Sequence, residues 1–197
     1  MRNKMKEKKI DFVKCQSDNF LIGRDQHYEG DVRAPNGYPL SLIAVISFEL
    51  IAEILKGQID EQAIDKTQKM YFFSYYDPDD YYLDYISYHG TKEEFDFINE
   101  GYVQTKTSGE HEYKFNKQLF YSIKTSEFNH GMSFMGGEPK FLQNEDYSAL
   151  DDYYFIGQIL GMDLPEDLAD LFYLHENIAY FYVKKDLTKG LFFVQST

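Results

Sequence analysis

The chain has 197 residues, of which 43% are hydrophobic and 18% aromatic, which is enough apolar surface for one domain with a sizeable core. Its net charge of −13 repels phosphate backbones and therefore argues against nucleic acid as a partner, while favouring a basic protein partner. No apolar stretch is long enough to cross a membrane. The single cysteine, Cys15, excludes an intrachain disulfide and a cysteine-based zinc site and fits a cytoplasmic protein.

The chain begins with a basic segment. Residues 1–15 carry several lysines and no cleavable apolar segment, so we expect a flexible N-terminus followed by one domain over residues 16–197. Residues 22–40 contain five glycine or proline residues and are expected to form a loop. The apolar run Leu42–Ile46 predicts a buried strand. Ser47 is a suitable N-cap for a short helix that follows it.

The next segment is rich in tyrosine. Tyr71–Tyr76 and Tyr81–Tyr88 flank Asp77–Asp80, a pattern that predicts a β-hairpin. Thr91 and Glu94 have the spacing of a capping box, so a short helix should start there.

The rest of the chain continues with strands. The polar residues 101–118 are expected to form a loop or an exposed hairpin between two halves, and Pro165 should lie near the start of a short helix. Further strands are predicted at Leu119–Ile123, Tyr153–Leu160, Ile178–Val183 and Leu191–Val194. Because strands outnumber the short helices, the expected fold class is α+β with a predominantly antiparallel sheet.

An internal duplication underlies this plan. Gly23 and the run that starts at Leu42 recur as Gly136 and the run that starts at Phe155, both with an offset of 113 residues (136 − 23 and 155 − 42). Met70–Phe73 recurs as Ala179–Tyr182 with an offset of 109 (180 − 71). Self-similarity of this kind predicts two fused halves, at about residues 20–100 and 130–197, that share a core.

Several motifs resemble those of a known family. Gly136, Gly137, Pro139 and Gln143 are similar to the Gly-Gly-x-Pro…Gln signature of the YwqG-like family, a group of bacterial domains of unknown function. Further similar segments are Pro39–Ile46, Tyr154–Ile159, Asn177–Tyr182, Lys185–Leu187 and Leu191–Phe193. The first half departs from the pattern, with valine at position 45 where the family has glutamine. The resemblance implies an α+β fold with internal duplication and brings no established activity.

The loop between Gly23 and Arg33 holds the densest mixture of functional groups in the chain. Arg24 and Arg33 suit carboxylate or phosphate, His27 suits proton transfer near neutral pH, and Glu29 adds a carboxylate. Two interpretations stay open: a network of ion pairs within the loop, or a ligand-binding site.

Gln158 is a polar residue inside an apolar run and must be hydrogen-bonded if it is buried. Its amide either caps backbone groups where the two halves meet or forms hydrogen bonds with the backbone of a ligand. The aspartates around Asp79 lack the EF-hand pattern, and no P-loop, nucleophile elbow, dinucleotide fingerprint or metalloprotease motif occurs. No cofactor or metal is expected.

Two functions follow from these observations. The first is a non-enzymatic protein-binding module, of the kind that neutralises a basic toxin or effector, since the chain is acidic and rich in tyrosine and lacks a catalytic motif. The second is a small-molecule binder or hydrolase with a site between the two halves, built from the Arg24–Arg33 loop and Gln158.

Overall fold

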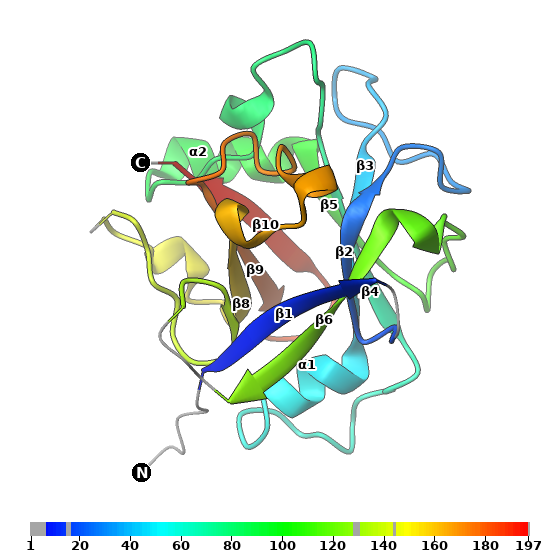
Figure 1. Cartoon of the computed structure of the whole chain (residues 1–197). Coiled ribbons are helices and arrows are strands. Elements are labelled where there is room, and N and C mark those ends of the chain that lie inside the picture. The colour runs from blue at the N-terminus through cyan, green and yellow to red at the C-terminus, as the bar shows by residue number, and fades with distance from the viewer. Residues whose placement is uncertain (1–6, 15–16, 128–130, 144, 197) are drawn as a thin grey trace.

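The computed structural model describes residues 7–14, 17–127, 131–143 and 145–196. They form one antiparallel sheet of ten strands in the order β10-β9-β8-β7-β1-β6-β2-β3-β4-β5 (Figure 1). The strands are β1 (Lys8–Lys14), β2 (Phe20–Asp25), β3 (Ser41–Ser47), β4 (Lys69–Ser74), β5 (Val103–Thr107), β6 (Phe120–Glu127), β7 (Phe134–Met135), β8 (Tyr153–Leu160), β9 (Ile178–Lys184) and β10 (Gly190–Gln195).

Helical segments in the described residues are short. They are the α-helices α1 (Phe48–Ile54) and α2 (Lys92–Phe97), a π-helical turn at Ile98–Tyr102, and 3-10 turns at Tyr82–Tyr85, Lys117–Leu119, Ser148–Leu150, Gly161–Asp163 and Glu166–Leu168. None of these helices is long and apolar enough to cross a membrane. The fold class is therefore α+β and mainly antiparallel β, as the sequence predicted.

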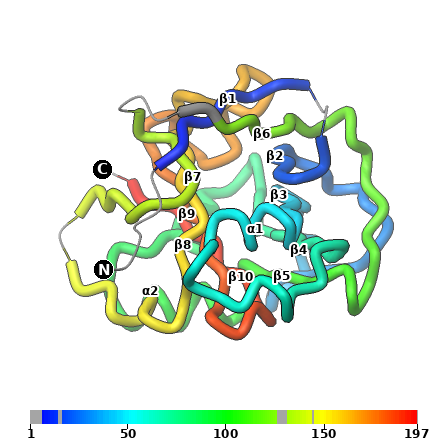
Figure 2. The backbone as a smooth tube through the Cα atoms, turned by 90° about the horizontal axis from the view of Figure 1, so that it is seen from below, coloured from blue at the N-terminus to red at the C-terminus, as the bar shows by residue number. Residues whose placement is uncertain are grey.

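The sheet curls into a ring, with β1 and β6 on one side and β5 and β10 on the other (Figure 2). The two outermost strands meet through side-chain bonds instead of a ladder. The hydroxyl of Thr105 in β5 accepts a hydrogen bond from the Gly190 amide in β10 at 2.9 Å and lies 3.2 Å from the Gly190 carbonyl oxygen. Val194 of β10 also exchanges backbone hydrogen bonds with Ile86 and Tyr88. Both outermost strands are thus joined to other parts of the chain.

The predicted duplication is visible in the strand registers. β2-β3-β4-β5 and β7-β8-β9-β10 are two four-stranded meanders on either side of the β1–β6 pair. Ile43 in β3 and Ile156 in β8 are each the extra residue of a register shift, and their offset is 113 (156 − 43). The pair Ala44–Phe72 next to the first shift matches Gly157–Phe181 next to the second. The offsets of 113 and 109 seen in the sequence therefore relate strands with the same register.

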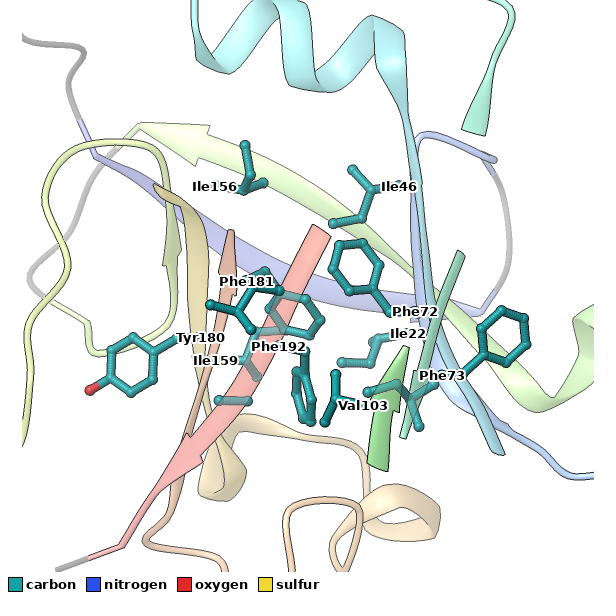
Figure 3. Packing of buried hydrophobic residues seen from close by; sticks show 14 of the residues in the cluster. Ile22, Ile46, Phe72, Phe73, Val103, Ile156, Ile159, Tyr180, Phe181 and Phe192 are labelled. Carbon is teal, nitrogen blue, oxygen red and sulfur yellow. The ribbon is translucent and has the colours of Figure 1, made fainter. Parts of the chain in front are cut away.

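The two meanders enclose one apolar core. Phe181 of β9 lies at the centre of the ring, with its ring centroid 5.5 Å from those of Phe20 and Phe72 and 5.2 Å from that of Phe192 (Figure 3). Alternate residues of a strand face opposite sides, and Tyr180 accordingly points away from this centre. The outer faces carry a second aromatic layer in which Tyr180 and Tyr182 pack against Phe193.

Helix α1 closes the lower end of the ring (Figures 1 and 2). It begins where predicted, because the Ser47 hydroxyl accepts a hydrogen bond from the Leu50 amide at 3.2 Å. Phe48 and Ile51 of the helix are buried in the core. At α2 the predicted capping box is present, with Thr91 and Glu94 bonding each other's backbone amides.

Four sequence expectations were wrong. Lys8–Lys14, expected in a flexible N-terminus, form β1, because β6 pairs with the whole segment. Phe20–Asp25 form a strand despite Gly23, whose missing side chain lets the Leu119 carbonyl approach. Tyr81–Tyr88 form no strand: Tyr82–Tyr85 is a 3-10 turn, and the Tyr82 hydroxyl bonds the Asp170 carbonyl. The polar segment 101–118 contains β5, which is paired on β4.

Candidate functional site

The four predicted loop residues do not converge on one site. The guanidinium of Arg24 donates to the Asp170 carboxylate at 2.9 Å, whereas that of Arg33 lies 2.6 Å from Asp31. Glu29 is exposed and pairs with Lys114 at 3.1 Å. Each of these three charged groups thus has a different partner, but of the three pairs only Arg33–Asp31 lies within the loop, so they do not form the expected network inside the loop.

His27 lies beside a shallow depression of about 290 Å³ that Glu29 and Lys114 also line. The buried carboxylate of Asp25 shapes this loop, accepting hydrogen bonds from the backbone amides of His27 and Asn116, both at 2.8 Å. Both oxygens of the Asp25 carboxylate are thus hydrogen-bonded to backbone amides. Beside His27 the depression therefore offers only exposed charges that already have partners.

Gln158 is fully buried and makes two backbone hydrogen bonds. Its carbonyl oxygen accepts from the Lys140 amide at 2.7 Å, and its amide donates to the Met132 carbonyl at 2.8 Å. The side chain thus caps backbone groups at both ends of the segment that contains the Gly-Gly motif, but these groups lie within the second half and not where the two halves meet. The segment turns sharply because Gly136 and Gly137 have φ of 71° and 75°, values that favour glycine.

The other two motif residues lie beyond this turn. Pro139 is half-buried, and the Gln143 carbonyl accepts a hydrogen bond from the Tyr147 hydroxyl at 3.3 Å. The motif therefore forms the connection between β7 and β8. It does not place an ionisable side chain next to Arg24 or His27.

Two further segments, residues 76–85 and 161–177, lie at the upper end of the ring in Figure 1 and form a different surface. We call it the acidic cap and define it as residues 76–85 together with residues 161–177. These 27 residues contain nine carboxylates and no lysine or arginine, a charge of −9 out of the net −13 of the chain. The nine are Asp77, Asp79, Asp80, Asp84, Asp163, Glu166, Asp167, Asp170 and Glu176.

Tyrosine side chains hold the two segments of the acidic cap together. The Tyr82 hydroxyl donates to the Asp170 carbonyl and the Tyr76 hydroxyl to the Asp170 carboxylate, both at 2.6 Å. The ring centroid of Tyr173 lies 4.8 Å from that of Tyr81 and 5.3 Å from that of Tyr82. Segments that are 85 residues apart in the sequence (161 − 76) thus form one continuous surface.

This surface also exposes large apolar side chains. The described residues include four exposed large hydrophobic side chains, of which three belong to the acidic cap: Met162 is 69% exposed, Tyr81 49% and Leu174 42%. Scattered exposed apolar residues are ordinary, but three on one surface surrounded by charge are typical of an interaction site. Sequence reasoning identified the acidity of the chain and the tyrosines, but not where they gather.

Asp170 is the electrostatic centre of the acidic cap. Partial burial opposes ionisation of its carboxyl, but the hydrogen bonds from Tyr76 and Arg24 outweigh burial and lower its pKa below the ordinary 3.8. Burial, and then the bond to Asp170, raise the pKa of Tyr76 to about 12. The Arg24 guanidinium also lies 4.1 Å from the centroid of the Tyr76 ring. The three side chains join β2 to the acidic cap.

We expect Asp170→Asn to lower the free energy of unfolding by about 0.5–1 kcal/mol at pH 7, a modest value because the ion pair is half exposed. The folded pKa lies below the unfolded one, so this contribution is complete above pH 3.8 and is lost as pH falls through the folded pKa. Urea unfolding at pH 7, 5 and 3 should show the difference from wild type shrinking at pH 3. A difference that is constant with pH, or equal to that of the exposed Asp151→Asn, would contradict this role.

His89 links Glu94 to the end of β10. Its Nδ1 lies 3.1 Å from a Glu94 carboxylate oxygen, and its Nε2 lies 3.3 Å from the Ser196 hydroxyl oxygen. This order is that of a Ser–His–acid triad. The Ser196 amide also donates to Nε2 at 3.4 Å, and Glu94 also accepts from the His89 and Thr91 amides, so all three residues have structural roles as well.

Among the described residues, no group of three or more His, Cys, Asp or Glu side chains is placed to hold a metal ion. Comparison with known proteins adds no relative: no family model matches the chain, and no curated protein matches it.

Proposed function

We propose that this protein is a non-enzymatic protein-binding module and that the acidic cap is its binding surface. The observation that carries this proposal is the presence of three exposed large apolar side chains among nine carboxylates, of which only Asp167 and Asp170 pair with a basic side chain in the described residues, Lys14 and Arg24. A few residues, most often Trp, Tyr and Arg, supply most of the binding energy at protein interfaces, and apolar patches with a polar rim mark such sites. The surrounding charge selects the partner and speeds its association.

The partner expected from this chemistry is a basic protein that presents an apolar patch. A neutraliser of a basic toxin or effector would act in this way, covering the positively charged surface of its target in the cytoplasm. The duplicated registers fit the proposed kinship with the YwqG-like family, which we keep as part of the proposal.

The test compares three charge reversals on the acidic cap with three elsewhere. The full-length protein is used to purify its partner from cells that produce it, and the Kd of the purified pair is then measured by calorimetry. We expect Asp79→Lys, Asp84→Lys and Glu166→Lys together to weaken binding about 10-fold or more, about 1.4 kcal/mol. All three residues are exposed.

The matched control carries Glu110→Lys, Glu112→Lys and Asp151→Lys, which change the net charge equally at exposed positions outside the acidic cap. It should bind like wild type at about 0.15 M salt, where screening weakens charges that are more than about 8 Å away. Equal loss of affinity in both triple variants would mean that only net charge matters. A saturable partner indifferent to both would contradict the proposal.

The alternative is a hydrolase, and the Ser196–His89–Glu94 chain is the observation that favours it. With Nδ1 of His89 donating to Glu94, Nε2 is an acceptor, and it would have to exchange its bond from the Ser196 amide for one from the Ser196 hydroxyl to take that proton as the hydroxyl attacks an acyl group. A fluorophosphonate probe should then label Ser196, and Ser196→Ala or His89→Ala should abolish labelling. If intact protein stays unlabelled under conditions that label a serine esterase, this alternative is rejected.

A further inference from the structure

Strand β1 is paired unequally on its two sides. β6 pairs with it along the whole of Lys8–Lys14, but β7 pairs only with Lys8 and Lys9. Among the described residues, nothing forms a ladder with Ile10–Lys14 on the β7 side. In an antiparallel ladder a residue bonds to one neighbouring strand at a time, so alternate residues of this stretch direct backbone N–H and C=O groups away from β6. This is an open sheet edge within an otherwise joined ring.

A groove runs along this edge and has a volume of about 520 Å³. Ile10 and Phe12 of β1 contribute apolar side chains on one side, and Leu164 and Pro165 of the acidic cap contribute them on the other. At one end of the groove Asp163 bonds the Ser133 hydroxyl. Figure 1 shows β1 beside β6, with the 161–177 segment on its other side. The groove thus joins an open strand edge to the acidic cap.

The charge around this groove is negative. Asp11 and Asp163 line it, and Glu166 and Asp167 follow on the same segment of the acidic cap. The three lysines of β1 are already paired, Lys8 with Glu53, Lys9 with Asp11 at 3.0 Å and Lys14 with Asp167 at 3.3 Å. Four carboxylates against Lys9, Lys14 and Lys124, which is opposite Asp11 in β6, leave a net charge of −1 beside the groove. An occupant with basic side chains is therefore favoured over a neutral or acidic one.

We propose that this groove accepts an extended segment of the basic partner, which adds to the open edge of β1 as a further antiparallel or parallel strand. The inference rests on the proposed function and specifies its mode of recognition. Backbone hydrogen bonds to Ile10–Lys14 supply sequence-independent affinity, as in other cases of strand addition. Apolar side chains at alternate positions of the segment contact Phe12 and Leu164, and its basic side chains face the acidic cap.

The test uses the full-length protein and a blocked peptide with alternating lysine and valine, Ac-KVKVKVK-NH₂. Amide hydrogen exchange is followed by NMR with and without this peptide. In the free protein, alternate amides of Ile10–Lys14 should exchange faster than their neighbours, which bond to β6. Saturating peptide should slow exchange of these open-edge amides about 10-fold or more.

Two controls separate strand addition from charge attraction. The same peptide with N-methyl groups at alternate residues keeps its charge but loses donors along one edge, and it should bind at least about 10-fold more weakly. Asp11→Lys should weaken binding of the unmodified peptide, whereas Glu112→Lys, at an exposed position outside the groove, should not.

The outcomes also separate this inference from the proposed function. If the peptide does not bind, or binds without protecting Ile10–Lys14 and regardless of N-methylation, strand addition is wrong. The acidic cap can still be the binding surface in that case, and its own test is the triple charge reversal. If the peptide protects β1 while the triple reversal leaves binding of the purified partner unchanged, strand addition stands and the role of the acidic cap fails.

Discussion

Replacing Phe181 with alanine is expected to lower the free energy of unfolding by about 3–5 kcal/mol, the range found for large aromatic residues removed from a core. Phe181 is fully buried at the centre of the ring and touches Phe20 and Phe72 of the first meander as well as Phe192 of the second. The cavity would therefore open between the two halves. Urea unfolding followed by circular dichroism measures this loss.

The control for this prediction is Leu119→Ala, which shortens a side chain that is 42% exposed and should cost less than about 0.5 kcal/mol. Two separate unfolding transitions in the Phe181→Ala variant would mean that the halves unfold independently once the central contact is lost. A loss below about 1 kcal/mol would contradict the view that Phe181 joins the two meanders.

The second large effect is expected for Gln158→Val, which gives the second half the residue that Val45 provides in the first. Valine removes the two hydrogen bonds that Gln158 makes with the Lys140 amide and the Met132 carbonyl. An unsatisfied buried group costs about 1–3 kcal/mol, so we expect a loss of about 2–4 kcal/mol. Faster amide exchange across Met132–Leu142 should accompany it.

The matched control is Gln143→Val, because the Gln143 side chain has no hydrogen-bond partner among the described residues and is half-buried. It should change stability by less than about 0.5 kcal/mol. If both glutamine variants lose stability equally, the two bonds of Gln158 are not what holds the Gly-Gly segment. Unchanged exchange in that segment would lead to the same conclusion.

The strands that the sequence predicted best are those with a strong local signal. Leu42–Ile46 is a continuous apolar run that ends at a helix cap, and such a run predicts a buried strand wherever its partners lie. The extra residue at Ile43 was invisible, because a run that is apolar on both faces shows no break in its alternation when one residue is inserted. Its recurrence at Ile156 shows that the extra residue is a feature common to both halves.

Elements that depend on distant partners were missed. Lys8–Lys14 mixes charged and apolar residues and becomes a strand because β6, more than 100 residues later, pairs with it. Tyr81–Tyr88 has the composition of a strand, yet Tyr82 and Tyr76 bond Asp170 instead. Propensity is a weak guide where tertiary contacts decide the conformation.

In the candidate site, too, local features were predictable and contacts with distant residues were not. The sequence indicated that Arg24 suits a carboxylate or a phosphate. Three carboxylates lie in its own loop, but its partner is Asp170, 146 residues away (170 − 24). The acidity of residues 76–85 and 161–177 was readable in the sequence, whereas their contact through Tyr173 was not. Charge can be counted from a sequence, but a surface exists only once the fold has brought its segments together.

The position of β1 has a consequence for the order in which the chain acquires its structure during synthesis. The strands of the first meander pair with neighbours that are synthesised soon after them. Lys8, in contrast, can pair only after Glu127 has been synthesised. Closing so long a stretch costs entropy before any contact repays it, and folds dominated by such pairings form slowly. Strand β1 thus stays unpaired while more than a hundred residues are added after it, a period in which a chaperone would be needed most.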